Sequence, residues 1–389
     1  MVQASGLPLE LKQPGRLTPQ MVSIIVPTLN EAENLPLLVP RIAGAMAGRA
    51  YEVVVVDDAS RDDTRGVCAT LAETYPLTLH VREQPEDGLS GAVLEGFARA
   101  RGDVLVVMDA DLQHPPERLP DLLAPLERGE ADFVLGSRHA PGGTVAEKWG
   151  VFRRVNSRVA TLLARPFAGR ETTDPMSGFI ALRRETLEGA RRLTPLGYKI
   201  GLELMCKCRV GRVKEIPIHF TARQHGQSKL TVAQQFRYLE HLSRLYDFTF
   251  PRLSPVVKFL IATACGWLTG LAVFLTLSRT GMVPMRAATL SYPAAILATA
   301  VFHLRYTRTQ RKFLVTRTPW RDFWIVALGE WAACAAVAAW IAARVREIHA
   351  LQVFAVTYGA ATLARYVLRK ELMQDIRGLR RDLRQEDMR

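Results

Sequence analysis

Apolar and polar residues follow two different patterns along the chain, and the change comes near residue 255. Before it, short runs rich in Val and Ile alternate with longer stretches that mix apolar and charged residues. The runs predict strands at Val22–Val26, Glu52–Val56 and Val104–Met108. The stretches predict helices at 32–47, 62–75 and 88–101. This alternation is typical of a parallel sheet covered by helices, so an α/β fold is expected here.

After residue 255 the chain contains four long segments with very few charges, at approximately 257–278, 283–304, 323–343 and 351–368. A bilayer core of ~30 Å needs about 20 helical residues, so each segment is long enough to cross it. The third segment lacks the polar stripe of a helix in a soluble protein. Four transmembrane helices are therefore expected. Pro293 and Glu330 interrupt them, and Glu330 either pairs with a neighbouring helix or reaches toward the interface.

The positive charges between the spans predict their orientation. The connection between spans two and three carries Arg305, Arg308, Arg311, Lys312, Arg317 and Arg321, and the tail carries Arg369, Lys370, Arg377, Arg380, Arg381 and Arg384. The other two connections carry two arginines each. Because positive loops stay in the cytoplasm, both termini and the first domain are expected there. The first twenty residues contain no apolar core of a signal peptide.

The composition favours anionic lipid as a partner and argues against nucleic acid. Lys and Arg number 51 against 38 Asp and Glu, which gives a net charge of +13 over 389 residues. Beside four predicted spans, this excess indicates contact with anionic lipid head groups. No helix-turn-helix or zinc-finger pattern is found, so nucleic acid is not an expected partner. The five cysteines lack metal-ligand spacing and are expected to be reduced.

Polar residues follow each of the three predicted strands, at Pro27–Glu31, Asp57–Ser60 and Asp109–Gln113. Ligands of parallel sheets bind outside the carboxyl ends of the strands. Asp57 and Asp58 are suited to accept hydrogen bonds from ribose hydroxyl or base N–H groups. Asp109 and Asp111 would project to the same side of an extended chain, with Gln113 continuing the alternation. Two carboxylates and an amide are hard oxygen ligands, which suit Mg²⁺ or Mn²⁺. Asn30 is also a candidate helix cap.

These motifs resemble those of the family-2 glycosyltransferases of GT-A fold. The matching runs are Pro27–Leu35, Val56–Ser60 and Asp109–Glu117, with further matches at 136–138, 174–179 and 220–230. Within the family they look most like the polyprenyl-phosphate branch, which includes the dolichol-phosphate mannose synthases. The resemblance covers about residues 21–250, and the four spans look similar to the GtrA-like domain of some members. One departure is Leu29, where the family often has Tyr.

The resemblance implies an inverting, metal-dependent transfer of mannose from GDP-mannose to a polyprenyl (dolichyl-type) monophosphate. It implies that Mg²⁺ or Mn²⁺ is held by Asp109, Asp111 and Gln113. The residues expected to bind the donor are Pro27, Leu29, Asn30, Glu31, Val56, Asp57, Asp58, Asp109, Ala110, Asp111, Gln113, Arg138, Arg223 and Lys229. Those expected in catalysis are Asp111, Arg138, Arg153 and Ser157. Arg153 and Ser157 lie one helical turn apart, a pattern that a basic membrane-surface helix also shows.

The chemistry of the acceptor decides whether a base is needed. A sugar hydroxyl needs a general base, for which Asp174 and Glu203 are the candidates. A polyprenyl phosphate is already anionic at pH 7 and needs cations to align it, for which Arg138 is the first candidate. A phosphate acceptor therefore predicts that Arg138 is essential for the chemical step and that Asp174 contributes much less.

The expected organisation is an N-terminal extension (1–20), a GT-A domain (21–230), interfacial helices (231–255), a four-span membrane domain (256–370) and a basic tail (371–389). Three other functions stay open. A related enzyme would transfer glucose or another hexose from a UDP-sugar. A processive polysaccharide synthase needs a Gln-x-x-Arg-Trp motif, whereas the run Gln234–Tyr238 ends in Tyr. A lipid-sugar flippase or scaffold would have an inactive transferase domain.

Overall fold

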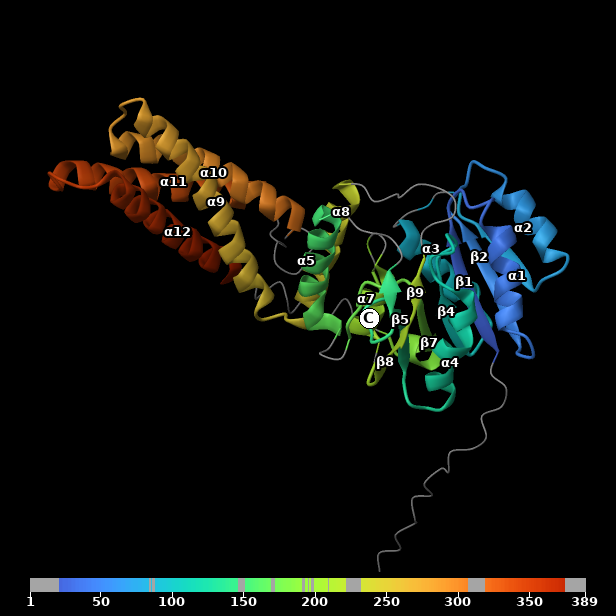
Figure 1. The fold of residues 1–389 in the computed structure, drawn as a ribbon. Coiled ribbons are helices and arrows are strands. Elements are labelled where there is room, and N and C mark those ends of the chain that lie inside the picture. The colour runs from blue at the N-terminus through green and yellow to red at the C-terminus, as the bar shows by residue number, and fades with distance from the viewer. Residues whose placement is uncertain are drawn as a thin grey trace, which may run out of the picture. The chain divides into compact units, whose positions relative to one another are not determined.

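The structure is a computed structural model that describes residues 21–374, except 84, 86–87, 146–150, 169–171, 191–192, 195, 197–198, 209, 222–231 and 307–318. The chain divides into two compact units, Met1–Leu245 and Tyr246–Arg389. Figure 1 shows strands in the first unit and long helices in the second.

The first unit is built on a seven-stranded sheet with the order β3-β2-β1-β4-β7-β5-β8. Its strands are β1 (Val22–Thr28), β2 (Tyr51–Asp57), β3 (Leu77–Val81), β4 (Val104–Val107), β5 (Phe133–Ser137), β7 (Ile180–Arg183) and β8 (Val213–Pro217). β1 pairs in parallel with β2 and β4, so the carboxyl ends of these three strands meet at one edge. β7 is antiparallel to both of its neighbours. A small second sheet pairs β6 (Thr144–Val145) with β9 (His219–Phe220).

Helices cover the sheet of the first unit (Figure 1). They are α1 (Leu35–Ala45), α2 (Thr64–Ala72), α3 (Gly88–Arg99) and α4 (Leu119–Glu127). The other helices are the 3₁₀ helix η1 (Pro116–Arg118), α5 (Val151–Ala168), α6 (Arg184–Glu188), α7 (Ile200–Lys207) and α8 (Val232–Thr249). Helix α5 packs on α7, and α8 continues past Leu245, the last residue of the first unit. The predicted α/β fold is confirmed. The central strands are buried along their whole length, as their continuous apolar runs require in a sheet covered on both faces.

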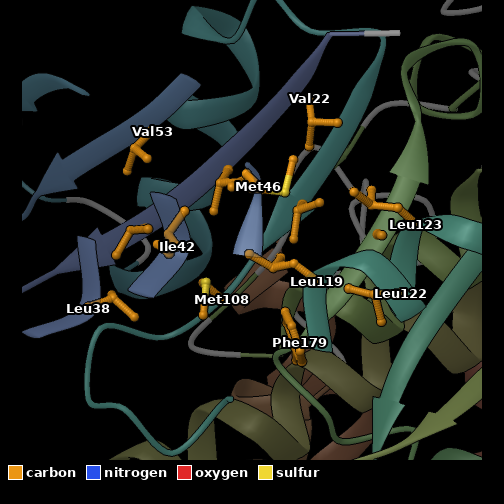
Figure 2. Packing of buried hydrophobic residues seen from close by; sticks show 14 of the residues in the cluster. Val22, Leu38, Ile42, Met46, Val53, Met108, Leu119, Leu122, Leu123 and Phe179 are labelled. Carbon is orange, nitrogen blue, oxygen red and sulfur yellow. The ribbon is translucent and has the colours of Figure 1, made fainter. Parts of the chain in front are cut away.

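The core lies between the sheet and helices α1 and α4. Leu38, Ile42 and Met46 from the α1 segment and Leu119 and Leu122 from α4 pack with the sheet residues (Figure 2). All five are fully buried. Burying a side chain of this size stabilises the fold by about 1.5–3 kcal/mol. This core supports the strands whose ends carry the polar motifs.

The second unit contains four helices, α9 (Ser254–Arg279), α10 (Pro284–Tyr306), α11 (Pro319–Arg344) and α12 (Ala350–Gln374). Within its described residues, the segments long and apolar enough to cross a membrane are Ser254–Arg279, Pro284–Phe302, Phe323–Arg344 and Ala350–Leu368. The four predicted spans are thus confirmed as helices of sufficient length. Aromatic rings join α10 to α12, since the Tyr358 ring centroid lies 4.8 Å from that of Tyr292, and Phe354 of α12 extends this cluster at 4.1 Å from Tyr358.

A buried ion pair joins α11 to α12. The Arg365 guanidinium donates through Nε and Nη2 to the two carboxylate oxygens of Glu330, at 2.7 Å each. The Tyr292 hydroxyl of α10 donates to the same carboxylate at 3.2 Å. The exposed fractions of the Arg365 and Glu330 side chains are 3% and 5%. Of the two positions that the sequence left open for Glu330, the structure therefore has the one that pairs with a neighbouring helix.

Candidate active site

Three loops follow β1, β2 and β4, and each contains a residue with a left-handed backbone. These residues are Asn30, Ala59 and Leu112, with φ of 56°, 55° and 62°. In the described part of the chain, no other residue except glycine has positive φ. This conformation is uncommon for side chains with a Cβ, and it concentrates at functional sites. The polar strand ends predicted from the sequence coincide with these three loops.

Hydrogen bonds tie the first two loops together. The backbone N–H of Asn30 donates to the Ser60 hydroxyl at 2.7 Å, and the N–H of Arg61 donates to the Asn30 side-chain oxygen at 2.8 Å. Asp57 is fully buried and accepts from the Ser60 N–H at 3.0 Å. Asn30 therefore joins the loops, and Asn34 occupies the cap position of α1 instead. Asp57 supports the loop that presents Asp58.

Asp58 pairs with Arg82, which the sequence reasoning missed. The Arg82 guanidinium donates to the Asp58 carboxylate at 2.7 Å, and both side chains are mostly buried. Burial raises the pKa of Asp58, although the charge and hydrogen bond of Arg82 oppose the rise. In the neighbouring loop, the Leu29 side chain is 37% exposed. Pro27 and Val56 are buried strand residues beneath these loops, and the Glu31 carboxylate accepts from the Asn34 amide at 2.7 Å.

The loop of the predicted metal ligands differs from the extended chain assumed in the sequence analysis. β4 ends at Val107, a turn follows, and Leu112 is left-handed, so strand alternation does not set the directions of Asp109, Asp111 and Gln113. That geometric argument was wrong. Asp111, Gln113 and the intervening backbone are buried, together with Ala110, whereas the Asp109 side chain is 34% exposed.

The donor set nevertheless fits a hard divalent cation. The Gln113 amide nitrogen donates to the Thr221 carbonyl at 3.1 Å, so its oxygen is the atom suited to ligation. One Asp111 oxygen accepts from the Gln113 N–H at 3.1 Å, which fixes the carboxylate. Across the described residues, no cluster of three or more His, Cys, Asp or Glu is placed to hold a metal. Mg²⁺ is commonly held by one or two carboxylates together with substrate phosphates and water, which matches Asp109 and Asp111.

His114 holds this loop from behind. Its Nδ1 accepts the backbone N–H of Asp109 at 3.1 Å, and its ring stacks on Phe179 with centroids 5.3 Å apart. Burial is the main cause that lowers the pKa of His114 to about 4, with the charges of Arg138 and Lys199 acting in the same direction. The imidazole is therefore neutral at pH 7, and the bond from the Asp109 N–H selects the tautomer whose proton is on Nε2.

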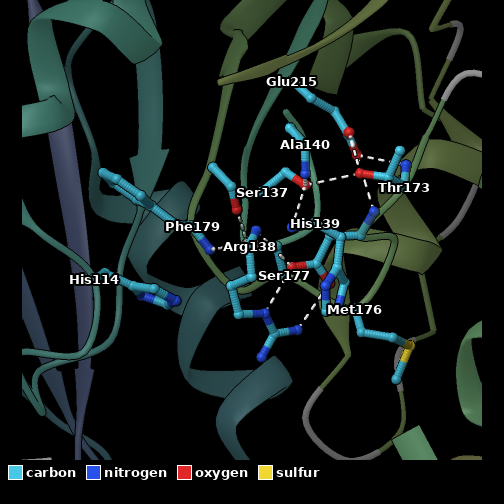
Figure 3. A network of polar contacts seen from close by, with 12 residues as sticks. His114, Ser137, Arg138, His139, Ala140, Thr173, Met176, Ser177, Phe179 and Glu215 are labelled. Atoms are coloured by element: carbon cyan, nitrogen blue, oxygen red, sulfur yellow. Dashed lines mark hydrogen bonds and ion pairs between the residues drawn. The ribbon is translucent and has the colours of Figure 1, made fainter. Parts of the chain in front are cut away.

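Arg138, labelled in Figure 3, follows β5 and makes a bidentate ion pair with Asp174. Its Nε and Nη2 donate to the two Asp174 oxygens at 2.7 and 2.8 Å, and its carbon Cζ lies 5.0 Å from the centroid of the Phe220 ring. Asp174 is 1% exposed. Burial alone would raise the pKa of Asp174, but the hydrogen bonds and charge of Arg138 outweigh it and hold that pKa below its usual value.

Hydrogen bonds to Glu215 fix the loop that carries Asp174. One Glu215 oxygen accepts the backbone N–H groups of Thr173 and Asp174 at 2.8 and 3.0 Å. The hydroxyls of Ser137 and Thr173 lie 2.9 Å apart (Figure 3). Arg138 is thus held by a preformed network.

Glu203, the other candidate base, lies in a buried cluster. Its carboxylate accepts from Lys207 Nζ at 2.6 Å and from the Thr194 N–H at 2.7 Å, and His241 Nε2 lies 2.8 Å from its second oxygen. Burial would raise the pKa of Glu203, but the bonds from His241 and Lys207 outweigh it and lower that pKa. Both candidate bases are therefore strongly held as carboxylates by cationic or hydrogen-bonding partners.

A pocket of about 80 Å³ opens at the carboxyl end of β4. It is lined by Leu89, Val107, Asp109, Ser177, Gly178, Lys199, Ile200 and Gly201. Lys199 was missed in the sequence analysis, because its place beside Asp109 depends on contacts between segments far apart in the chain. The structure thus brings Asp109, Arg138, Asp174 and Lys199 into one electrostatic group.

Four predicted site residues lie where the structure describes no side chain. Arg223 and Lys229 lie outside the described residues. Arg153 and Ser157 belong to α5, whose backbone is described there without its side chains. The N-terminal extension 1–20, the tail after Gln374, and Arg308, Arg311, Lys312 and Arg317 also lie outside the described residues.

Comparisons with known proteins assign the chain to a family. Residues 23–189 match the sequence model of the family described as Glycosyl transferase family 2. A dolichol-phosphate mannosyltransferase from Pyrococcus furiosus is 44% identical over 247 residues, which cover 63% of this chain and 69% of that protein. A protein of the same name from Saccharomyces cerevisiae is 40% identical over 239 residues, covering 59% and 88%. An undecaprenyl-phosphate mannosyltransferase from Micrococcus luteus is 38% identical over 217 residues, covering 54% and 87%.

Among solved structures, glucosyl-3-phosphoglycerate synthase from Mycobacterium tuberculosis, with Mn²⁺, UDP-glucose and phosphoglyceric acid, is 23% identical with a TM-score of 0.45. The likeness covers 59% of this chain and 80% of that one. The sequence relatives carry the assignment, since this chain covers most of their length at 38–44% identity. The chain is a glycosyltransferase with apolar helices of membrane-spanning length after its catalytic unit, and it belongs to glycosyl transferase family 2.

Proposed function

We propose that the protein transfers mannose from GDP-mannose to a polyprenyl monophosphate of the dolichyl type, with inversion at the anomeric carbon. The product is polyprenyl-phosphate mannose, a lipid-linked sugar donor for glycosylation. The names of the relatives, dolichol-phosphate and undecaprenyl-phosphate mannosyltransferase, support this substrate pair. The observation that carries the proposal is Arg138, a mostly buried cation held by Asp174 in the same electrostatic group as Asp109.

The donor would bind across the three strand-end loops. Asp58, with the loop of Asn30 and Ser60, is suited to contact the nucleoside, and Asp109, Asp111 and Gln113 would hold Mg²⁺ or Mn²⁺. When bound, the cation would neutralise the charge that develops on the leaving diphosphate. The chain's own part is to keep Asp111 in place through the Gln113 N–H and Asp109 in place through His114.

The acceptor would be a phosphate because a base is not provided by Asp174 or Glu203. Asp174 is engaged by Arg138, and Glu203 is engaged by Lys207 and His241. A phosphate oxygen attacks without losing a proton, and Arg138 offers the cation that aligns it. Arg153 and Ser157 remain proposed acceptor contacts, and Arg223 and Lys229 remain proposed contacts of the donor.

The protein would be a multi-pass membrane protein with its catalytic unit and both termini in the cytoplasm. The four apolar helices support the membrane assignment. The excess of Lys and Arg between spans two and three and after span four supports the orientation. The interfacial helices at 231–255 would bring the isoprenoid chain to the catalytic unit, beside anionic head groups.

The test is to incubate membranes containing the full chain with labelled GDP-mannose, UDP-glucose and other sugar nucleotides, one at a time, and to identify the labelled lipid. We expect label only from GDP-mannose, in a lipid that releases mannose on mild acid treatment. Addition of EDTA should abolish labelling and Mn²⁺ should restore it. Asp111→Asn should also abolish labelling, whereas the exposed Asp121→Asn, the same change on α4, should not.

Three results would contradict the proposal. Labelling from a UDP-sugar alone would assign another hexose. Full labelling in EDTA would exclude the cation. Label in a polymer or a hydroxyl-linked product would replace the phosphate acceptor.

A further inference from the structure

We infer that Lys199 binds a hydroxyl group of the sugar that is transferred, in a sugar-binding pocket that it forms with Asp109. The inference rests on the proposed function, because it names the group that contacts the hexose of the donor. Lys199 would thus be a specificity-determining residue for the sugar.

The position of the pocket is the first reason. Its residues come from four segments: Leu89 at the start of α3, Val107 and Asp109 after β4, Ser177 and Gly178 before β7, and Lys199 to Gly201 at the start of α7. It opens at the edge of the sheet where the three strand-end loops lie. Asp109 belongs both to this pocket and to the proposed cation site. The group next to the diphosphate in a sugar nucleotide is the sugar itself.

The second reason is that Lys199 is held in a fixed place. Its Nζ donates to the Met176 carbonyl at 2.7 Å, in the same loop that carries Asp174. The Lys199 ammonium is partly buried, close to the charges of Arg138, Asp109 and Asp174. Burying a cation costs free energy that only polar partners offset. A side chain that merely filled this space would be apolar.

The charge of the pocket indicates the class of ligand. Among the described residues that line it, Asp109 is the one acid and Lys199 the one base, and the others are neutral. The Ser177 hydroxyl is engaged with the Gly136 carbonyl at 2.6 Å. A sugar hydroxyl can accept from the Lys199 ammonium and donate to the Asp109 carboxylate, and the sugar's C–H groups suit Leu89 and Ile200.

The size of the pocket agrees with part of a hexose. The pocket volume of about 80 Å³ is several times the roughly 10–15 Å³ that a cavity needs to admit one water molecule. This is enough for one edge of a pyranose ring with its hydroxyl groups. Gly178 keeps this space open, because a Cβ there would lie 3.4 Å from both Asp109 carboxylate oxygens.

The experiment measures what the sugar adds to donor binding. Calorimetry on the full chain in detergent, with Mn²⁺, gives Kd for GDP-mannose and for GDP, and the ratio Kd(GDP)/Kd(GDP-mannose) isolates the mannosyl group. We expect Lys199→Met to lower this ratio by about tenfold or more, since a hydrogen bond to a charged group contributes that much. Its Kd for GDP should stay within about twofold of the wild-type value. Lys214→Met, the same change at an exposed position on β8, should leave both constants unchanged.

A second variant covers the case in which Lys199→Met does not fold. Gly178→Ala adds one methyl group at ordinary contact distance from Asp109, so the fold should tolerate it. It should lower the same ratio, again with little change in Kd for GDP.

Other outcomes would overturn the inference. An equal loss of affinity for GDP and GDP-mannose in Lys199→Met would assign Lys199 to the diphosphate. An unchanged ratio, with a raised KM for polyprenyl phosphate only, would assign it to the acceptor. If the wild type binds UDP-glucose and not GDP-mannose, the proposed donor is wrong. The ratio measured with UDP and UDP-glucose then decides the role of Lys199 independently.

Discussion

Removing Arg138 should destabilise the catalytic unit as well as impair transfer. Arg138→Ala leaves Asp174, which is 1% exposed, without the two hydrogen bonds that hold its charge. Breaking a buried ion pair by removing one partner costs about 3–5 kcal/mol. At about 2–4 °C for each kcal/mol in a unit of this size, the melting temperature should fall by roughly 6–20 °C. Thermal melting of the full chain in detergent measures this shift.

A double-mutant cycle separates the pair from its surroundings. Asp174→Asn in the Arg138→Ala background should restore part of the lost stability, because the unpaired charge is then removed. Two independent residues would give additive changes within about 0.5 kcal/mol, and that additivity would refute the reasoning.

The same pair has a pH signature with a definite sign. The folded pKa of Asp174 lies below its ordinary value, so its contribution is fully present above the unfolded carboxyl pKa of about 3.9. It is lost as the pH falls through the lowered folded pKa. The difference in melting temperature between wild type and Arg138→Ala should therefore shrink in acid. A difference that grows in acid would contradict the ion pair.

The ion pair also changes one prediction made from the sequence. Asp174→Asn was expected to affect the chemical step much less than Arg138→Ala. Because Asp174 holds both Nε and Nη2 of Arg138, Asp174→Asn should lower the single-turnover rate by about tenfold or more. A wild-type rate in a folded Asp174→Asn would show that Asp174 does not orient Arg138.

Three further predictions concern other parts of the molecule. The pKa of His114 is about 4 in the folded protein, against about 6.5 in the unfolded chain. As the pH falls from 6.5 to 4, protonation of the unfolded chain should therefore lower the free energy of unfolding by about 3 kcal/mol. His114→Asn should flatten this part of the plot of melting temperature against pH. Arg365→Leu should lower the melting temperature more than Arg365→Leu combined with Glu330→Leu, because the single change leaves a buried carboxylate; equal melting temperatures would exclude the pair. A fragment ending at Phe250 should bind GDP with Mn²⁺ by calorimetry, since the division between units falls at Leu245; a folded fragment that does not bind would move the boundary.

The sequence predicted those strands and helices whose apolar periodicity is visible within the element itself. Strands β1, β2 and β4 and helices α1 to α3 are found near their predicted positions, because their apolar periodicity reports burial directly. Strands β3, β5, β7 and β8 were missed, since each is a short run whose assignment depends on a distant partner. β7 is also antiparallel, which no periodicity indicates.

The candidate site likewise contains residues that motifs predicted and residues that only tertiary contacts bring in. The polar strand ends were visible as motifs, and the β1, β2 and β4 pairing brings them to one edge. The left-handed backbone of Leu112 was not visible, because a leucine gives no turn signal, and the assumed alternation of Asp109 to Gln113 failed there. Arg82 and Lys199 were missed because arginine and lysine are common surface residues. Only tertiary contacts bring them to Asp58 and Met176.

The Glu330–Arg365 pair has a consequence for how the protein enters the membrane. An unpaired charge within a transmembrane helix opposes insertion, by about 2.5–3.5 kcal/mol for an Arg at the helix centre and by less toward the helix ends. α11 and α12 are joined by a short connection, at 345–349, and each carries one member of the pair. Inserted together as a helical hairpin, they bury a neutral pair, whereas each helix inserted alone would carry an unpaired charge into lipid. The last two spans should therefore leave the translocon as one unit, after α12 has been synthesised.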